Sequence, residues 1–260
     1  MFLLKVKKRQ RFLLTSLFLA LGFVFIQALG ETYRISGIIL LSLATVLLFT
    51  WSLWEGLGKN ATLLTLVLPP LFTLGVGFFW FLLPTSILAR IPIVLFYSIG
   101  IYALSLTANI YTVSAVRTIA LLRAAKGIGF VLTLVTSFLI LDTVISMKPT
   151  QVVGSIFVFM VSFPLFLQGL WTSSVDTLFD KSLLLMCAIS SLVVTEIFAV
   201  LYFWPTTVIV GSLFLTTTMY ILLGLSQARI EQRLFSQTVR EYLTVGLLVL
   251  LGMFIATRWA

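Results

Sequence analysis

Three ionisable residues lie within long apolar stretches of this sequence, where a charge is unusual. Arg90 follows the start of one stretch, Asp142 lies near the end of another, and Glu196 lies within a third. A charge in the hydrocarbon of a bilayer costs at least about 2.5–3.5 kcal/mol, so such residues face the protein interior, pair with one another or line water. We therefore expect Arg90 to pair with Asp142, with Glu196 or with both.

Two interpretations of these residues remain open. They are a candidate intramembrane polar site for a substrate or proton, with Glu196 as proton acceptor or cation-binding group. Alternatively, they form an ion pair that only connects helices, or Arg90 and Asp142 extend toward the interface. Counted at about 1.5 Å per residue from the outer boundary, Arg90 and Asp142 lie at a depth of about 7 Å and Glu196 at about 10 Å. Glu196 is the strongest single candidate because it is the deepest.

Other kinds of catalytic or cofactor chemistry are not indicated. The chain has no histidine, which excludes His-ligated haem, His-based zinc sites and catalysis by Ser-His or Cys-His pairs. The single cysteine, Cys187, lies in an apolar stretch and is typical of a small core residue. Neither a phosphate-binding GxxxxGK[ST] motif nor a GxSxG motif occurs. We expect no catalytic residue, no metal ligand and no cofactor.

A pair of prolines, Pro69 and Pro70, lies in the middle of another apolar stretch. Proline removes an amide donor and clashes with the preceding turn, so the sequence predicts a helix break there. Broken backbone is not tolerated against lipid, and the break must face protein or a cavity. Transporter sites contain such breaks, and so does ordinary helix packing.

The elements that position these residues are membrane-spanning helices. The chain has 260 residues, of which 60% are hydrophobic and 10% charged, against about 25% charged in an average soluble domain. A helix needs about 20 apolar residues to cross the hydrocarbon core. Nine stretches meet this requirement: 12–29, 35–54, 61–83, 87–108, 128–146, 152–171, 183–203, 207–225 and 242–258. The sequence predicts an all-α, polytopic transmembrane helix bundle.

The distribution of Lys and Arg predicts the orientation. With the N-terminus inside, the outer segments hold only Arg34, Arg90, Lys148 and Arg258 of the 17 basic residues. This bias places the N-terminus in the cytoplasm and, after nine spans, the C-terminus outside. The net charge of +9 thus reflects orientation in a bilayer and gives no indication of nucleic-acid binding. The first apolar run is longer than the core of a signal peptide, and we expect it to be retained.

Two inner connections, 109–126 and 226–241, combine apolar and basic residues at helical spacing. They predict either short amphipathic helices at the cytoplasmic interface or helical extensions of the preceding spans. In both cases their basic residues can contact anionic lipid.

The chain resembles itself after a shift of about 118 residues, which suggests a duplication. Phe12-x-Leu14-Thr15 matches Phe130-x-Leu132-Thr133, and Gly37 and Trp54 have the same separation as Gly154 and Trp171. We predict two parallel four-helix repeats, each ending in an amphipathic inner segment, at 1–126 and 127–241, with 242–260 as an additional helix.

Three stretches of the sequence resemble a family of uncharacterised bacterial polytopic membrane proteins. They are Asn109 to Tyr111 with Arg117 to Ala125, Ser212 to Thr217, and Arg240 to Gly246. The resemblance implies a location in the bacterial cytoplasmic membrane and brings no function with it.

Three classes of function fit these observations. The first is a small transporter or translocator of lipid or another hydrophobic substrate, with Arg90, Asp142 and Glu196 in its pathway. The second is a structural or accessory subunit that binds a membrane protein partner. The third is a membrane-embedded, lipid-modifying enzyme with Glu196 or Asp142 as general base, for which the sequence offers no nucleophile or metal partner.

Overall fold

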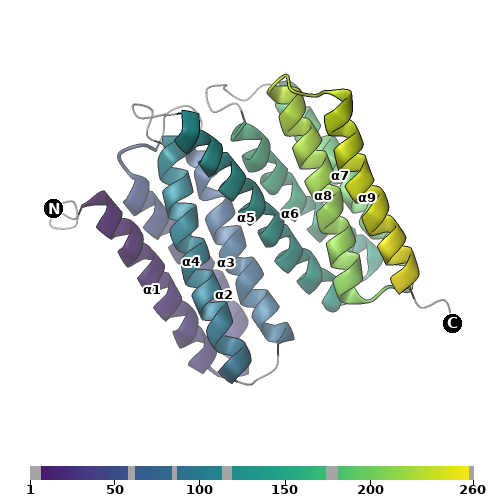
Figure 1. Cartoon of the computed structure of the whole chain (residues 1–260). Coiled ribbons are helices and arrows are strands. Elements are labelled where there is room, and N and C mark those ends of the chain that lie inside the picture. Colours follow the sequence, from purple (N-terminus) through teal and green to yellow (C-terminus); the bar gives the residue numbers. More distant parts are fainter. Residues whose placement is uncertain (1–6, 58–61, 84–86, 113–118, 174–180, 258–260) are drawn as a thin grey trace. The chain divides into compact units, whose positions relative to one another are not determined.

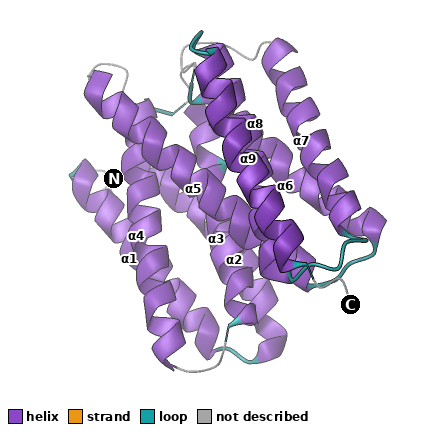
Figure 2. Cartoon of the chain, turned by 45° about the vertical axis from the view of Figure 1, so that its right-hand side comes forward, coloured by secondary structure: helices purple, strands orange, loops and turns teal. Residues whose placement is uncertain are grey.

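Every regular element in the described part of the chain is a helix. The computed structural model describes residues 7–57, 62–83, 87–112, 119–173 and 181–257. Within these ranges, nine helical segments are long and apolar enough to cross a membrane (Figures 1 and 2). They are α1 (Lys8–Ala28), α2 (Glu31–Leu53), α3 (Leu68–Phe79) flanked by the 3-10 helices η2 (Thr62–Leu66) and η3 (Trp80–Leu82), α4 (Ile87–Thr112), α5 (Ile119–Ser146), α6 (Gln151–Trp171), α7 (Lys181–Leu201), α8 (Val208–Ile230) and α9 (Ser236–Ala256). The predicted all-α, membrane-spanning class is confirmed. Of the basic residues used for orientation, Lys5, Lys59, Arg117 and Arg258 lie outside the described residues.

The chain divides into two compact units, Met1–Leu132 and Thr133–Ala260. Unit 1 contains α1 to α4 and the first part of α5, and unit 2 contains the remainder of α5 with α6 to α9. We describe each unit by itself.

A cluster of aromatic rings forms the core of unit 1. The ring of Phe23 on α1 lies 4.9 Å from that of Tyr97 on α4, and Phe72 on α3 stacks on Tyr97 at 6.0 Å between ring centroids. Trp80 in η3 packs edge-on against Phe23 at 5.6 Å. Such ring pairs add about 0.5–1.5 kcal/mol each beyond the area they bury. The cluster fixes the position of Trp80 at the end of α3.

The two consecutive prolines lie in the first turn of an α-helix. The 3-10 helix η2 ends at Leu66, and α3 begins at Leu68 with Pro69 and Pro70 directly after it. In a first turn the missing proline amide has no intrahelical partner to lose. Ser42 on α2 donates a hydrogen bond to the carbonyl of Pro70 at 3.1 Å, and Pro69 is buried. The interrupted backbone therefore faces the neighbouring helix α2.

Three buried hydroxyl groups connect α2, α3 and α4. The Thr73 oxygen lies 3.1 Å from the hydroxyl oxygens of both Thr45 and Tyr97. All three side chains are fully enclosed. Thr45 can donate to the carbonyl of Leu41 at 2.9 Å, which leaves its oxygen as an acceptor. The network satisfies the hydroxyls internally, as a water-free environment requires.

At the predicted cytoplasmic end of unit 1, a buried arginine forms an ion pair. Arg11 on α1 is 3% exposed and donates to Glu55, which follows α2 and is 57% exposed. One turn deeper, the hydroxyls of Thr15 and Ser52 lie 2.7 Å apart. The Arg11 guanidinium beside Glu55 holds the pKa of that carboxyl below its usual range.

Small residues permit close helix packing in unit 2. A Cβ atom at Gly154 on α6 would lie 2.6 Å from the ring of Phe198 on α7, and one at Gly224 on α8 would lie 2.3 Å from the ring of Tyr242 on α9. Lipid tails are as apolar as the helices, so this close fit is a main source of helix association in a bilayer.

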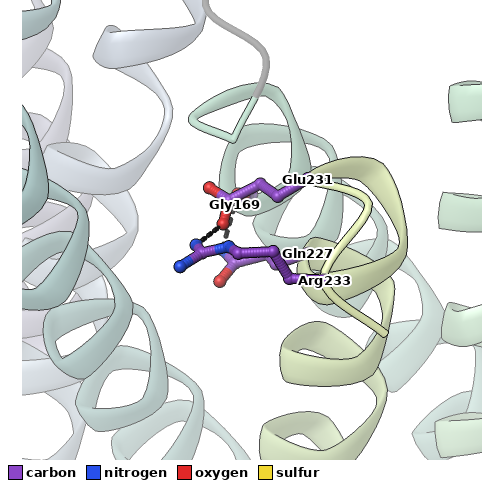
Figure 3. A network of polar contacts seen from close by, with 4 residues as sticks. All are labelled: Gly169, Gln227, Glu231 and Arg233. Atoms are coloured by element: carbon purple, nitrogen blue, oxygen red, sulfur yellow. Dashed lines mark hydrogen bonds and ion pairs between the residues drawn. The ribbon is translucent and has the colours of Figure 1, made fainter. Parts of the chain in front are cut away.

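The predicted cytoplasmic end of unit 2 contains a polar network (Figure 3). The Gln227 amide on α8 donates to the carbonyl of Gly169 on α6 at 2.9 Å. Beyond α8, Glu231 and Arg233 form an ion pair across Gln232, whose φ of 56° is left-handed. The network connects α8 to α6 and stabilises the short turn into α9.

The two inner connections extend the spans beyond the predicted boundaries. α8 continues to Ile230 and α9 begins at Ser236, so 226–241 forms no separate amphipathic helix. Similarly, α4 reaches Thr112 and α5 begins at Ile119, with 113–118 outside the described residues. Extension of the preceding span therefore describes 226–230 only, whereas 231–235 forms a turn and 236–241 belongs to the following helix α9.

Gly154 tests the packing of unit 2. Alanine normally stabilises a helix interior by about 1 kcal/mol over glycine, but overpacking against a buried ring costs about 1–3 kcal/mol. Because an added Cβ at Gly154 meets Phe198, we expect Gly154→Ala to lower the thermal unfolding temperature in detergent. The matched control is Gly252→Ala, since a Cβ there has no atom within 4 Å. Equal unfolding temperatures for the two variants would contradict this packing.

Glu55 predicts a pH dependence of stability. Its pKa is lowered in the folded state, so the ion pair contributes fully above the ordinary glutamate pKa and is lost as the pH falls through the lower folded value. We expect Glu55→Gln to lower the unfolding temperature by a constant amount between about pH 7 and pH 5. In more acidic buffer, wild type and variant should converge. Glu241→Gln, at an exposed position, serves as control, and a difference that persists in acid would exclude this role of the carboxylate.

Candidate functional site

Asp142 lies buried on α5 in unit 2 and is 3% exposed. The Ser212 hydroxyl on α8 lies 2.9 Å from its Oδ1 atom and donates to it. The same hydroxyl is 3.0 Å from the Ile209 carbonyl, so the two acceptors compete for one proton. The contact connects α5 to α8 close to the end of both helices.

Glu196, in contrast to the buried Asp142, lies on an exposed face of α7. Beyond the first turn, the other exposed residues at helical spacing on this side are apolar: Leu185, Ile189, Leu192, Val200 and, just after α7, Phe203. In the described part of the chain, Glu196 has no hydrogen-bond or ion-pair partner. An unpaired carboxylate among apolar side chains in a span is unfavourable, and such residues usually have a functional or structural partner.

Two concavities open at the predicted outer end of unit 2, and each carboxyl group lies one helical turn deeper than one of them. The first, here the Lys148 pocket, has a volume of about 360 Å³. It is lined by Ile145, Lys148, Pro149, Phe198, Leu201, Tyr202, Trp204, Thr206, Val208 and Gly211. Ile145 is one turn from Asp142, and Gly211 is next to Ser212.

The second concavity, here the Phe203 hollow, is wider and has a volume of about 670 Å³. It is lined by Gln151, Ala199, Val200, Phe203, Trp204 and Pro205. Ala199 and Val200 lie three and four residues beyond Glu196 on the same face of α7. Trp204 lines both concavities, and its indole donates to the Thr257 hydroxyl at 2.9 Å. The outer end of unit 2 therefore combines apolar walls with a few polar groups, a composition typical of ligand sites.

Arg90 lies in unit 1, near the start of α4. Its guanidinium carbon is 5.3 Å from the centroid of the Trp80 ring, in cation–π geometry. Its Nε atom is enclosed and has no hydrogen-bond acceptor. Arg90 is half-buried, and the described side chains of unit 1 provide it with no carboxylate partner.

The three sequence-predicted residues thus have three different environments. Asp142 and Glu196 share unit 2 but form no contact with each other, whereas Arg90 belongs to unit 1. Its predicted pairing with either carboxylate stays a prediction. The described residues contain no group of three or more side chains of the metal-binding types His, Cys, Asp and Glu.

Sequence reasoning did not identify Ser212, Trp80 or Lys148 as parts of these environments. Ser212 is one hydroxyl among many in the spans, and no spacing rule relates it to Asp142, 70 residues earlier. Trp80 was recognisable only as an aromatic residue near a helix end, which is a common interfacial position.

Comparison with known proteins places the chain in a family without assigning a role. A family model described as a protein of unknown function (DUF5656) matches residues 18–256. No curated protein and no solved structure matches the chain. The match covers nearly all of the sequence and agrees with the resemblance to an uncharacterised family. The chain therefore belongs to the DUF5656 family of proteins of unknown function.

Proposed function

We propose that this membrane protein is a small translocator of an amphipathic, lipid-like molecule, and that unit 2 binds the polar head group. The observation that carries the proposal is the placement of Asp142 and Glu196, each one helical turn below a concavity at the same end of unit 2. Groups of this kind in a membrane usually belong to substrate or proton pathways.

The chemistry of the site favours a head group that donates hydrogen bonds. Both acidic groups accept hydrogen bonds when ionised, and neither has a cationic partner among the described residues. A hydroxyl or ammonium group can supply the missing donor. The apolar side chains that line the Phe203 hollow suit the adjoining hydrocarbon chain.

An accessory subunit is the second candidate, favoured by one observation. Beyond the first turn of α7, which contains Lys181, Glu196 is the one charged residue of the helix, and its exposed neighbours at helical spacing are apolar. A partner helix that donates a hydrogen bond to it would stabilise a complex. We do not propose the lipid-modifying enzyme, because no second acidic side chain in the described residues contacts Glu196.

Two further features of the sequence remain part of this proposal. We propose that the protein resides in a bacterial cytoplasmic membrane and that its units arose by duplication. In support, α2, α3 and α4 pack in the same pairwise pattern as α6, α7 and α8. The matched residues Thr15 and Thr133 each contact a polar side chain on the following helix, Ser52 at 2.7 Å and Gln168 at 3.4 Å.

Lipid translocation is measurable with the purified protein in vesicles. The probes are phosphatidylethanolamine and phosphatidylglycerol that carry a fluorophore on the acyl chain, and dithionite destroys fluorescence in the exposed leaflet only. In vesicles with the wild-type protein, we expect probe from the inner leaflet to reach the outer leaflet, and lose its fluorescence, faster than in protein-free vesicles. We expect the translocation rate of Glu196→Gln and of Asp142→Asn to be lower by about tenfold or more, because each variant loses one charge-assisted contact.

The controls separate folding from function. Glu241→Gln makes the same chemical change at an exposed position, next to the amide of Gln237 at 3.1 Å, and should transport like wild type. Unfolding temperatures of all variants show whether a slow rate reflects misfolding. If wild-type vesicles lose no more fluorescence than empty ones, the translocator proposal fails. If the variants match a fast wild type, the two acidic residues are not the site.

The orientation has its own test. Nine spans and a cytoplasmic N-terminus place Ala260 outside, so alkaline phosphatase fused after Ala260 should be active in a bacterial host. Green fluorescent protein at the same position should be dark. If the green fluorescent protein fusion is bright and the phosphatase fusion is inactive, the orientation is the reverse of the predicted one. The Lys148 pocket then lies on the cytoplasmic side.

A further inference from the structure

Two arginines lie near Trp80 at the predicted outer end of unit 1. The Arg90 guanidinium lies over the Trp80 ring, as described above. Arg34, in the first turn of α2, lines a small cavity together with Trp80 and Gln27. Two of the four basic residues that the sequence assigns to the outer side are therefore associated with the same ring.

The side chains of Arg34, Arg90 and Trp80 present hydrogen-bond donors and no acceptors. Arg34 donates through Nε to the Leu29 carbonyl at 3.0 Å. Among the side chains that the structure describes in unit 1, which do not include that of Glu31, neither arginine has an ion-pair partner. The Nε atom of Arg90 and the Nε2 atom of Gln27 are enclosed without a partner. An uncompensated guanidinium in or near hydrocarbon is unfavourable, and an enclosed amide donor adds to that cost.

The local structure orients the two guanidinium groups before any ligand binds. The Leu29 carbonyl uses only the Nε of Arg34, so its terminal nitrogens remain available. Trp80 is itself fixed by its edge-on contact with Phe23 at 5.6 Å, and it restricts Arg90. A guanidinium group presents paired N–H donors that match the oxygens of a phosphate group.

We propose that unit 1 binds a phosphate group at this end, with Arg34 and Arg90 as its ligands. The cavity beside Trp80 has a volume of about 10 Å³, which suits one water molecule at most. The phosphate therefore lies at the mouth of the cavity and not inside it. Arg90 is the first residue of its apolar span, from which a long side chain can extend to the lipid head groups, so the phosphate of a phospholipid is the natural source.

This assignment differs from an intrachain pair between Arg90 and a carboxylate of unit 2, and it does not depend on translocation. If Arg90 binds a lipid phosphate, neutralising Glu196 or Asp142 leaves that binding unchanged. If Arg90 pairs with one of these residues, neutralising the carboxylate releases the arginine and increases the binding of anionic lipid.

Native mass spectrometry of the delipidated full chain in neutral detergent, titrated with phosphatidylglycerol, tests the proposal. We expect one tight lipid on the wild-type protein and about tenfold weaker binding for Arg90→Gln and for Arg34→Gln, each of which loses a charge-assisted contact. Arg90→Lys keeps the charge without the paired donors, so its affinity for the lipid should lie between those of wild type and Arg90→Gln. Lys181→Gln removes an exposed cation at the start of α7, outside both concavities of unit 2, and should bind like wild type.

The remaining measurements identify the source of the phosphate and distinguish a loss of binding from misfolding. Competition by inorganic phosphate indicates a site for the free anion, and its absence indicates the phospholipid. If Arg90→Gln fails to fold, Arg34→Gln and Arg90→Lys still decide the outcome. Wild-type affinity in both arginine variants, an equal loss in Lys181→Gln, or stronger binding in Glu196→Gln would overturn the proposal.

Discussion

The absence of water from the hydrocarbon core is the constraint on which the rest of this structure depends. Each polar group within a span must find its partner inside the protein, so the backbone is helical and the hydroxyls bond within or between helices. Thr45, Thr73 and Tyr97 satisfy one another in unit 1. The Pro69-Pro70 pair obeys the same requirement, because α3 starts there and Ser42 donates to the Pro70 carbonyl. Charges that remain without partners are consequently the best indicators of ligands.

The candidate sites follow from that reasoning and differ in chemistry. Unit 2 offers acidic groups beneath open concavities, and unit 1 offers guanidinium groups beside a fixed indole. Asp142 already has one partner in Ser212, whereas Glu196 has none among the described residues. Asp142 is therefore suited to fixing the geometry of α5 against α8, and Glu196 to exchanging partners.

The sequence was sufficient for the class of the protein and for the nine spans, because about 20 consecutive apolar residues have few alternative structures. It located Arg90, Asp142 and Glu196 for the same reason, since a charge is conspicuous in an apolar run. It could not tell that Asp142 is buried while Glu196 is exposed, because a span that is apolar on all sides has no pattern that marks its protein-facing side. It also could not place the start of α3 at Leu68, which depends on the packing of Pro69 and Ser42.

Helix α9 is the least buried of the candidate spans in the described part of the chain. Met253 is the one buried residue of α9. The helix packs on α8 where Gly224 leaves room for the ring of Tyr242 and Gly246 leaves room for Ile221. α9 is synthesised after the helices on which it packs, and its described contacts are with α8 and with Trp204. We expect it to partition into lipid as an independent helix and to join the completed unit by lateral diffusion. The order of assembly thus follows the order of translation.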